Sequence, residues 1–337
     1  MSTARVRVLF IGGWGRSGST LLDRLLGHVP GVVSLGEVRE IWLRGVVEDR
    51  PCGCDRAFSA CPFWTEVGER GWGGWNQLDV HRAIELQNEL DKPWMVPLLA
   101  MPGAAARVRP GTRSQVDAYR AILDTLYGAI AETAGPDTRA LVDSTKIPSH
   151  AYLLRAVPRV DLRMLHLVRD SRGVAYSWRK LVQKKVSKGD PAYLPRYGVA
   201  GSAARWLVYN AETSAIARLG VPYAFMRYED LIADPAGQTQ RALALAGVVP
   251  AAEDLEFLDG REVELAPSHT VEGNPMRFTF GRRTLRVDDE WRAALPARDR
   301  IALTGLTLPG LIRYGYGVRG RNGTSVPTPS NLEQGAP

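Results

Sequence analysis

The sequence predicts an α/β fold in which helices cover both faces of a central parallel sheet. Three observations support this expectation: five short apolar segments are typical of buried strands, helical patterns separate them, and a glycine-rich turn follows the first strand. The turn makes the expected fold P-loop-like, with three layers. We expect one such domain over residues 1–320, interrupted by a Trp- and Cys-rich insertion at 49–111, and a disordered tail at 321–337.

The five candidate strands are short and apolar, and each is followed by polar residues or glycine. Parallel α/β sheets bind ligands at the carboxyl ends of their strands, so the residues that follow these segments are expected to face one crevice. The candidate strands are Val6–Ile11, Val32–Leu35, Ala140–Val142, Leu162–Val168 and Tyr223–Met226.

Helical patterns fill the stretches between the strands, as parallel pairing with crossover connections requires. Their alternation with the strands favours helices on both faces of the sheet. The candidate helices are Ser19–His28, Val38–Val47, Asp79–Leu90, Ser114–Thr133, Arg172–Lys184, Ala203–Leu219 and Gly237–Ala246.

The insertion at 49–111 breaks this alternation and is rich in Trp, Pro and Gly. It fits a lid, an acceptor-binding segment with an aromatic wall, or the core of a small subdomain. The tryptophans concerned are Trp64, Trp72, Trp75 and Trp94.

All three cysteines, Cys52, Cys54 and Cys61, fall within this insertion. Three thiolates can hold zinc with a fourth ligand, but no further Cys or His is close in sequence. The same residues are also compatible with a local disulfide involving Cys61, or with free thiols in a turn-rich loop. We expect a chain without a metal.

Composition indicates a globular protein with an anionic ligand. Hydrophobic residues make up 45% of the chain and charged residues 23%, with a net charge of +7 and a pI of about 9.4. The basic residues are spread out and no nucleic-acid motif is present, so we expect no nucleic-acid partner. No segment reaches the roughly 18 consecutive apolar residues of a membrane span. The first strand begins without a signal-peptide core, which predicts a cytoplasmic protein.

The glycine-rich turn runs from Gly13 to Thr20 and nearly satisfies the P-loop pattern G-x-x-x-x-G-K-[ST]. Ser19 stands at the lysine position, and the nearest cation, Arg16, lies three residues earlier. Backbone amides at a helix N-terminus bind anions. The displaced cation therefore indicates a phosphate-like ligand that is held differently from Mg-ATP.

A second anion site is predicted after the fourth strand, in the motif Arg169-Asp-Ser-Arg-Gly-Val-Ala-Tyr-Ser177. Asp170 or Ser171 can cap the helix that follows. The Arg169 guanidinium and the Ser177 hydroxyl can then hold a phosphate apart from the glycine-rich turn. The alternative is a local ion pair between Arg169 and Asp170.

Together the two motifs resemble those of the sulfotransferases that use 3′-phosphoadenosine-5′-phosphosulfate (PAPS). More narrowly, they resemble the bacterial branch whose site is similar to that of protein-tyrosine sulfotransferases. The resemblance extends from about residue 6 to residue 318.

The resemblance implies that the glycine-rich turn wraps the 5′-phosphosulfate and that Arg169 and Ser177 hold the 3′-phosphate. Tyr228, in Tyr-Glu-Asp-Leu, is implied to lie near the adenine, with an ordinary buried aromatic as the alternative. The segment 268–277 resembles the loop that closes over the cofactor, which adds Gly273 and Asn274. The residues implied to surround the phosphosulfate are Arg16, Ser17, Gly18, Ser19, Thr20 and Leu21.

The same branch uses a glutamate in a Gly-Glu pair as its catalytic base, and Gly36-Glu37 matches this pattern. The alternative for Glu37 is a first-turn residue that complements a helix dipole. Lys146 matches an Asp-Ser-x-Lys segment as a second catalytic cation, with a solvated surface lysine as the alternative. None of the five histidines has a pattern typical of a catalytic base.

The function implied is in-line transfer of a sulfuryl group from PAPS to a hydroxyl of a small molecule, such as a natural product, lipid or carbohydrate. Glu37 would accept the proton, and Arg16 and Lys146 would stabilise the developing charge. A P-loop-like small-molecule kinase that uses Mg-ATP and a non-catalytic binder of nucleotides or polyanions are the competing hypotheses.

Overall fold

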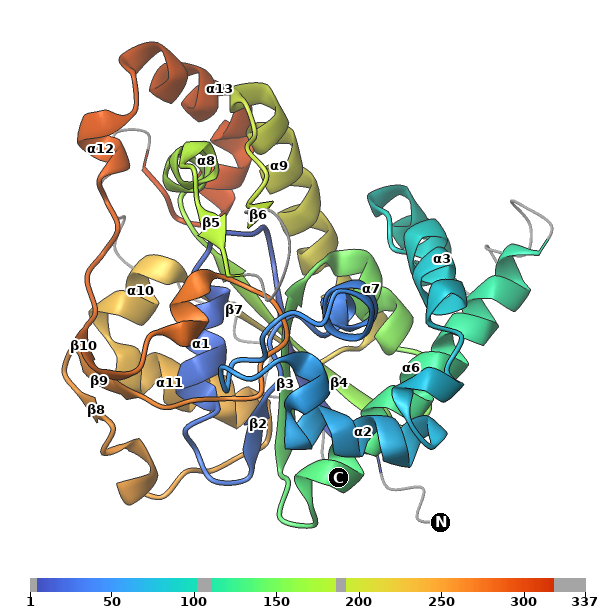
Figure 1. Cartoon of the computed structure of the whole chain (residues 1–337). Coiled ribbons are helices and arrows are strands. Elements are labelled where there is room, and N and C mark those ends of the chain that lie inside the picture. Colours follow the sequence, from blue (N-terminus) through green and yellow to red (C-terminus); the bar gives the residue numbers. More distant parts are fainter. Residues whose placement is uncertain (1–4, 102–110, 186–191, 318–337) are drawn as a thin grey trace, which may run out of the picture.

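The computed structural model describes residues 5–101, 111–185 and 192–317. A central sheet with helices on both faces dominates it (Figure 1). The sheet has five parallel strands in the order β2-β3-β1-β4-β7. These strands are β1 (Val6–Gly12), β2 (Val32–Ser34), β3 (Ala140–Lys146), β4 (Val160–Val168) and β7 (Tyr223–Arg227).

All five predicted strands are confirmed, and the register shows why β1 is central. Val8 of β1 pairs with Leu141 of β3 on one side and with Leu162 of β4 on the other. The register between β1 and β3 shifts near their carboxyl ends. Phe10 pairs with Asp143, but Gly12, two residues later, pairs with Lys146, three residues later, so β3 carries one extra residue. This bulge lies at the carboxyl end of the strand.

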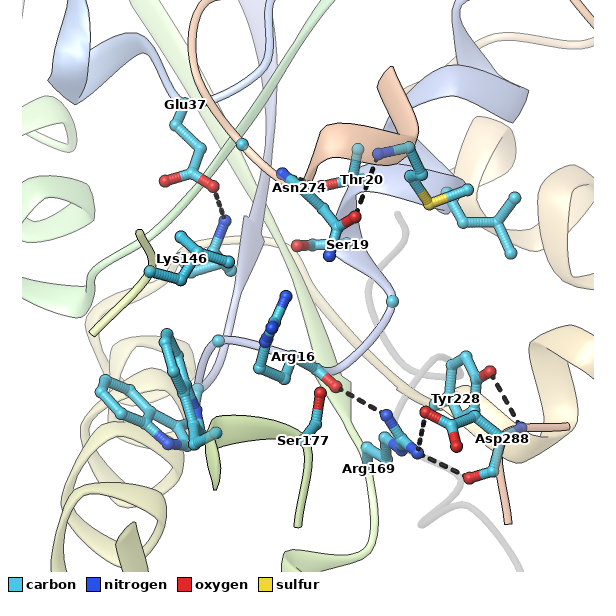
Figure 2. A pocket seen from close by; sticks show the side chains of 18 of the residues that line it. Arg16, Ser19, Thr20, Glu37, Lys146, Arg169, Ser177, Tyr228, Asn274 and Asp288 are labelled. Atoms are coloured by element: carbon cyan, nitrogen blue, oxygen red, sulfur yellow. Dashed lines mark hydrogen bonds and ion pairs between the residues drawn. The ribbon is translucent and has the colours of Figure 1, made fainter. Parts of the chain in front are cut away.

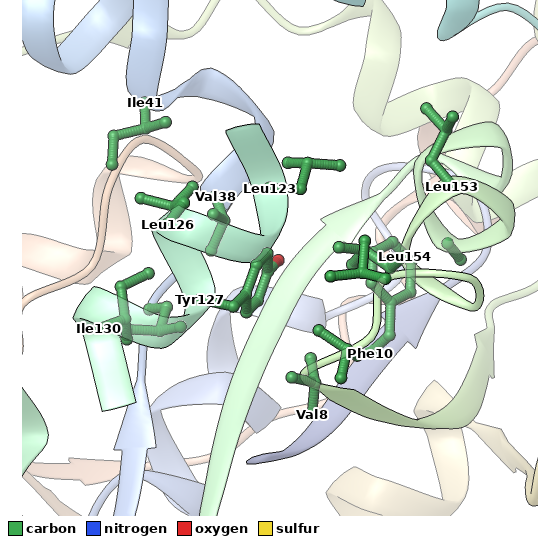
Figure 3. Packing of buried hydrophobic residues seen from close by; sticks show 14 of the residues in the cluster. Val8, Phe10, Val38, Ile41, Leu123, Leu126, Tyr127, Ile130, Leu153 and Leu154 are labelled. Atoms are coloured by element: carbon green, nitrogen blue, oxygen red, sulfur yellow. The ribbon is translucent and has the colours of Figure 1, made fainter. Parts of the chain in front are cut away.

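Alternate side chains of β1 enter two separate hydrophobic cores, as the two-residue period of a strand requires. Val8 and Phe10 are fully buried in a core shared with the long helix that follows the insertion, including Tyr127 (Figure 3). Leu9 and Ile11 enter the other core. The sheet is therefore buried on both faces, which explains its continuous apolar strands.

The helices fall into two layers and a group near one end of the sheet (Figure 1). One face carries α1 (Ser19–Leu26), α10 (Tyr228–Ala233) and α11 (Pro235–Leu245), and the other carries α6 (Thr112–Ala134) and α7 (Pro148–Leu154). A third group comprises α8 (Ser171–Arg179), α9 (Val199–Ala215), α12 (Trp291–Ala294) and α13 (Ala297–Arg313). Short 3-10 helices are Val38–Glu40, Phe58–Ala60, Trp75–Gln77, Pro93–Met95, Ile216–Leu219, Glu253–Leu255 and Pro275–Phe278.

Two predicted helices are wrong in part. The segment Val38–Val47 is helical but not α-helical, because the 3-10 turn Val38–Glu40 runs directly into a π-helix, Ile41–Val47. The predicted helix Arg172–Lys184 ends at Arg179, where Lys180 turns to an extended conformation. The chain then forms a two-stranded ribbon of β5 (Gln183–Lys184) and β6 (Ala192–Tyr193).

The insertion forms a small helical subdomain against α6 within its described residues. It contains α2 (Pro62–Trp72), α3 (Val80–Leu90) and α4 (Val96–Ala100). Trp64 is fully buried there, and Trp72 and Trp75 pack on each other with ring centroids 5.4 Å apart. Trp94, by contrast, is 66% exposed. Trp64 belongs to the same hydrophobic core as Val8 and Phe10 of β1, and Trp72 and Trp75 pack against that core, so these three tryptophans join the insertion to the sheet.

A separate three-stranded antiparallel sheet joins β8 (Leu258–Asp259), β9 (Glu262–Leu265) and β10 (Gly281–Thr284). The loop between β9 and β10 contains the segment 268–277. No helix in the described parts of the chain has the length and apolar composition needed to cross a bilayer. The predicted tail 321–337 lies outside the described residues.

Candidate active site

A cavity of about 680 Å³ opens at the carboxyl edge of the central sheet. Each of the five strands delivers one predicted site residue to its wall, directly or through the loop that follows it. These residues are Arg16 after β1, Glu37 after β2, Lys146 at the end of β3, Arg169 after β4 and Tyr228 after β7. Figure 2 shows Arg16 between the Glu37–Lys146 pair and the Arg169–Asp288 pair.

The glycine-rich turn after β1 exposes a row of backbone amides to the cavity. Gly13 and Gly18 have φ values of 130° and 90°, which a residue with a side chain rarely adopts. A Cβ on Gly18 would also lie 2.6 Å from the Tyr228 ring. The helix α1 begins at Ser19 without a side-chain cap, so its first amides lack the side-chain partner that often satisfies them. The turn therefore has the geometry in which helix N-termini bind anions.

Ser17 is the member of this turn that does not line the cavity with its side chain. Its hydroxyl donates to the carbonyl oxygen of Trp14, which stabilises the turn itself. Arg16, Gly18, Ser19, Thr20 and Leu21 all line the cavity.

Arg16 adopts φ of 72°, so its side chain leaves the turn in a direction that a regular backbone would not give. The half-buried guanidinium lies over the Trp178 ring, 5.3 Å from its centroid, and its Nε has no hydrogen-bond partner. Burial is the main cause that lowers the Arg16 pKa, and the positive charge of Arg169 lowers it further. An anion bound here would relieve both penalties.

Glu37 and Lys146 face each other across the carboxyl edge of the sheet. The Lys146 Nζ donates to Glu37 Oε1 at 2.6 Å and to the Ser144 carbonyl oxygen at 2.9 Å. Lys146 follows the bulge of β3 and has φ of 72°. Lys146 is therefore a partly buried, paired cation and not a solvated surface lysine.

The position of Glu37 depends on contacts from two distant segments. The Ser144 amide donates to the Gly36 carbonyl oxygen at 2.8 Å, and the Glu37 amide donates to the Val271 carbonyl oxygen at 3.2 Å. Gly36 has φ of 72°, and a Cβ there would lie 2.4 Å from the Val271 oxygen. Glycine is required because the chain segments approach this closely.

The pKa of the Glu37 carboxyl is raised above its ordinary value. Burial is the largest cause, and the negative charges of Glu40 and Glu272 add to it. Lys146 acts in the opposite direction through its charge and its hydrogen bond. A carboxylate with a raised pKa is a better proton acceptor than an ordinary surface glutamate.

The second predicted anion site lies at the other end of the cavity. Asp170 pairs with Arg172, not with Arg169, since Arg172 Nη2 lies 2.6 Å from Asp170 Oδ2. This excludes the local Arg169–Asp170 pair. Asp170 also accepts from the Arg172 amide and so caps α8, as predicted. Ser177, in the second turn of α8, lines the cavity.

Arg169 is 6% exposed and points to the cavity wall. Its Nη1 donates to the Arg16 carbonyl oxygen at 3.2 Å, and its Nη2 lies 3.1 Å from Asp288 Oδ2. The guanidinium packs on the Tyr228 ring, 4.7 Å from its centroid. Burial raises the pKa of Tyr228, so this ring is a neutral platform beside the cation.

The segment 268–277 closes the side of the cavity above α1. Gly273 and Asn274 both line it, and the Asn274 amide donates to Thr20 Oγ1 at 3.4 Å. The Asn274 side chain caps the following 3-10 turn by accepting from the Met276 amide at 3.0 Å. Gly273 has φ of 129° and lies beside Glu37 and Thr20.

Sequence reasoning missed several residues that line this cavity. Arg39 pairs with Asp91 and Glu40, and it lies close to Glu37 along the chain. Asp288 comes from the segment after β10, for which no motif gave a signal. An aromatic wall is also new, and it consists of Trp14, Trp178, Tyr197 and Tyr209. Trp14 lies within the glycine-rich turn and Trp178 directly follows Ser177, but neither was predicted to line the cavity.

None of the five histidines lines the cavity. His166 is a satisfied core residue, as predicted, since its ring nitrogens contact Tyr223 Oη at 2.8 Å and Asn210 Oδ1 at 2.9 Å. Burial lowers the pKa of His166 to about 4. Glu37, the base predicted from the sequence, does line the cavity, together with the carboxylates Glu40, Glu272 and Asp288.

No protein-family model and no curated protein matches this chain. Solved structures with similar folds include the sulfotransferase domain of the Synechococcus PCC 7002 olefin synthase. Its sequence is 20% identical, the match covers 91% of this chain and 95% of that domain, and the TM-score is 0.46. The sulfotransferase domain of the curacin biosynthetic pathway has 17% identity, 91% and 97% coverage and a TM-score of 0.45. Sulfotransferase STF1 of Mycobacterium tuberculosis H37Rv has 18% identity, 75% and 70% coverage and a TM-score of 0.39.

These proteins are sulfotransferases, and this chain is similar to them in structure. Fold similarity at such low identity does not assign a chemistry. The residues of the cavity must therefore carry the functional conclusion.

Proposed function

We propose that this chain is a sulfotransferase that moves a sulfuryl group from PAPS to a hydroxyl of a small molecule. One observation carries the proposal. Two proposed anion sites, the turn after β1 and the Arg169–Ser177 site after β4, line the same cavity, and the Glu37–Lys146 pair lines it as well. A donor with phosphate-type charges at two separate positions fits this arrangement. Mg-ATP, whose phosphates form one continuous chain, does not need the second site.

The donor's 5′-phosphosulfate fits the turn after β1, where the uncapped start of α1 and the residues Arg16, Gly18 and Ser19 line the cavity. Its 3′-phosphate fits the Arg169 guanidinium and the Ser177 hydroxyl. Tyr228 can pack beside the adenine. Gly273 and Asn274 would contact the donor from the opposite wall.

The proposed reaction is a single in-line displacement. The acceptor oxygen attacks the sulfur, a new S–O bond forms, and the bond from sulfur to the bridging oxygen breaks. Its electron pair stays on the phosphate of the leaving bisphosphoadenosine. Glu37 takes the proton from the attacking hydroxyl, and the raised pKa of its carboxyl suits this task. Arg16 and Lys146 stabilise the charge that develops on the bridging oxygen and the sulfuryl group.

The acceptor is proposed to be a hydroxyl on an apolar or aromatic body. The four rings of the aromatic wall pack together, with Trp14 and Tyr209 centroids 4.7 Å apart. A small-molecule acceptor, the absence of a catalytic metal and a cytoplasmic location remain predictions of the sequence.

Ligand-dependent thermal stability tests the proposal directly. We expect 3′,5′-bisphosphoadenosine to raise the melting temperature more than Mg-ATP or inorganic pyrophosphate does, because only it carries phosphates at two separate positions that could engage both proposed sites. Selective stabilisation by Mg-ATP would support the kinase hypothesis. An equal response to all three ligands would support a non-catalytic polyanion binder. Acceptors can then be screened with sulfate-labelled PAPS, with transfer of label as the readout.

A further inference from the structure

A cluster of three thiols and one imidazole lies outside the cavity. The atoms Cys52 Sγ, Cys54 Sγ, Cys61 Sγ and His269 Nδ1 all lie within 4.8 Å of one another. The three cysteines come from one short stretch of the insertion, and His269 comes from the loop between β9 and β10. The fold therefore supplies the fourth group that the sequence around the cysteines lacks.

The spacing of these atoms fits one tetrahedral metal ion. Cys54 Sγ lies 3.7 Å from Cys61 Sγ, and His269 Nδ1 lies 3.3 Å from Cys61 Sγ and 3.9 Å from Cys52 Sγ. Zinc bonds of about 2.3 Å to sulfur and about 2.0 Å to nitrogen place neighbouring ligand atoms roughly 3.5–3.8 Å apart. A disulfide requires about 2.05 Å between sulfurs, and all three cysteines are free.

The surroundings hold these groups in place. The His269 ring stacks on Phe63, with centroids 5.0 Å apart and planes 9° from parallel. The backbone carbonyl oxygen of His269 accepts a hydrogen bond from the Trp64 indole nitrogen at 2.8 Å. A tight turn, closed by the Asp55 amide donating to the Cys52 carbonyl oxygen at 2.8 Å, brings the first two thiols together. Cys52 and Cys61 are buried, with 1% and 0% exposure.

We propose that Cys52, Cys54, Cys61 and His269 bind one Zn²⁺ in a closed structural site. Binding would displace the three thiol protons and leave the imidazole neutral, with Nδ1 as its ligand atom. Four protein ligands leave no open position, so the ion would stabilise the fold and would not take part in the transfer. This proposal replaces our expectation, from sequence, of a chain without a metal.

The site would fasten the insertion to the loop that borders the active site. Two residues beyond His269, the backbone of Val271 pairs with that of Gly36, and Gly273 and Asn274 line the cavity. The Gly53 amide donates to the Thr270 carbonyl oxygen at 2.9 Å. Arg277 bridges the same two segments, with bonds of 2.6 Å to the carbonyl oxygens of Thr270 and Pro51. Loss of zinc should therefore loosen the wall beside Glu37.

Metal analysis of the full chain, purified under reducing conditions without added metal, tests the site. We expect one zinc ion per chain by inductively coupled plasma mass spectrometry. Cys61→Ser and His269→Ala should each lose most of it. His81→Ala, an exposed histidine on α3, should keep it and serves as the matched control. The readout does not depend on the proposed transferase activity, so failure of one proposal leaves the other standing.

A second measurement uses the unaltered chain, because a ligand variant can fail to fold. After removal of zinc with a chelator, added Co²⁺ should give the intense visible absorption of a tetrahedral thiolate site, and Zn²⁺ should abolish it. The melting temperature should fall on chelation and recover with Zn²⁺. Reduced thiols that bind neither metal would overturn the proposal, as would a Cys54–Cys61 disulfide in the purified protein.

Discussion

The two ends of the cavity are built in different ways. At the end where the sulfuryl group would be transferred, Arg16, Gly36 and Lys146 all have positive φ, and Glu37 is held by contacts from β3 and from the loop after β9. At the other end, Arg169 and Ser177 come from one βα turn and its helix, with ordinary backbone conformations.

We call the end with Glu37 and Lys146 the reaction end and the end with Arg169 and Ser177 the anchoring end; the two differ in what fixes the direction of their charged side chains. A non-glycine residue at positive φ costs roughly 1–3 kcal/mol and persists only where its surroundings hold it. Two such residues, Arg16 and Lys146, would hold positive charge in place before a substrate binds, as the proposed electrostatic stabilisation needs. At the anchoring end, the Arg169 side chain is held by an ion pair with Asp288, which lies on a distant segment of the chain.

The largest effect should come from Glu37→Gln. Glutamine keeps the size of the side chain and can still accept from Lys146, but it cannot take a proton from the acceptor. We expect kcat to fall by roughly 10²–10⁴-fold, with unchanged affinity for bisphosphoadenosine by calorimetry. Glu40→Gln is the control, since Glu40 also lines the cavity but pairs with Arg39 at 2.7 Å. Near-normal turnover in Glu37→Gln would remove the assignment of the base.

Arg169→Ala should show the opposite pattern, with binding lost first. Removing charge-assisted hydrogen bonds to a phosphate costs roughly 1.5–3 kcal/mol, which is about a tenfold to hundredfold loss in bisphosphoadenosine affinity. Arg169→Lys should recover part of that loss, because it restores the charge but not the two-pronged geometry. If Arg169→Ala bound the ligand normally, the 3′-phosphate site would have to lie elsewhere.

The reaction end should be the pH-sensitive one. Glu37 must be ionised to accept a proton, so kcat should fall about tenfold per pH unit below its pKa. Burial raises this pKa, which places the fall above the ordinary glutamate value of 4.5. Lys146 favours the ionised carboxylate, so Lys146→Met should move the fall to still higher pH. A profile with the same midpoint in both proteins would show that another group controls it.

The smallest effect should come from Asp288→Asn at the anchoring end. The Asp288 carboxylate pairs with Arg169 and competes with a bound phosphate for the same guanidinium. Because Asp288 is partly exposed, we expect bisphosphoadenosine to bind only roughly two- to fivefold more tightly in the variant. The control variant is Asp289→Asn, at the exposed residue next to Asp288, and it should leave the affinity for bisphosphoadenosine unchanged. Weaker binding in Asp288→Asn would mean that Asp288 supports the ligand.

The sequence predicted the sheet, and with it one cavity-lining residue for each strand, because both depend on local patterns. Short apolar strands with polar or glycine ends identified β1, β2, β3, β4 and β7, and parallel strands bring their carboxyl ends to one edge. Each strand could thus be assigned a site residue before any contact was known. The π-helix at Ile41–Val47 escaped prediction because its apolar pattern resembles that of an α-helix.

Contacts between distant segments could not be predicted in the same way. Asp288, Tyr197 and Tyr209 reach the cavity from segments without a recognised motif, and His269 joins Cys61 across 208 positions of the chain. No local period or spacing reports such neighbours. One sequence shows only which residues are adjacent along the backbone.

By itself, the sequence determined the order of the chemical groups along the chain: a glycine-rich anion turn, a Gly-Glu pair, a lysine and an arginine, each at the end of an apolar strand. Only the tertiary structure decided how these groups face one another. The bulge in β3 turns Lys146 toward Glu37, and Val271 holds Gly36 so that the carboxylate reaches Lys146 Nζ at 2.6 Å. The physical reason is that strand periodicity is a local property, whereas side-chain direction at a strand end depends on backbone conformations that distant contacts stabilise.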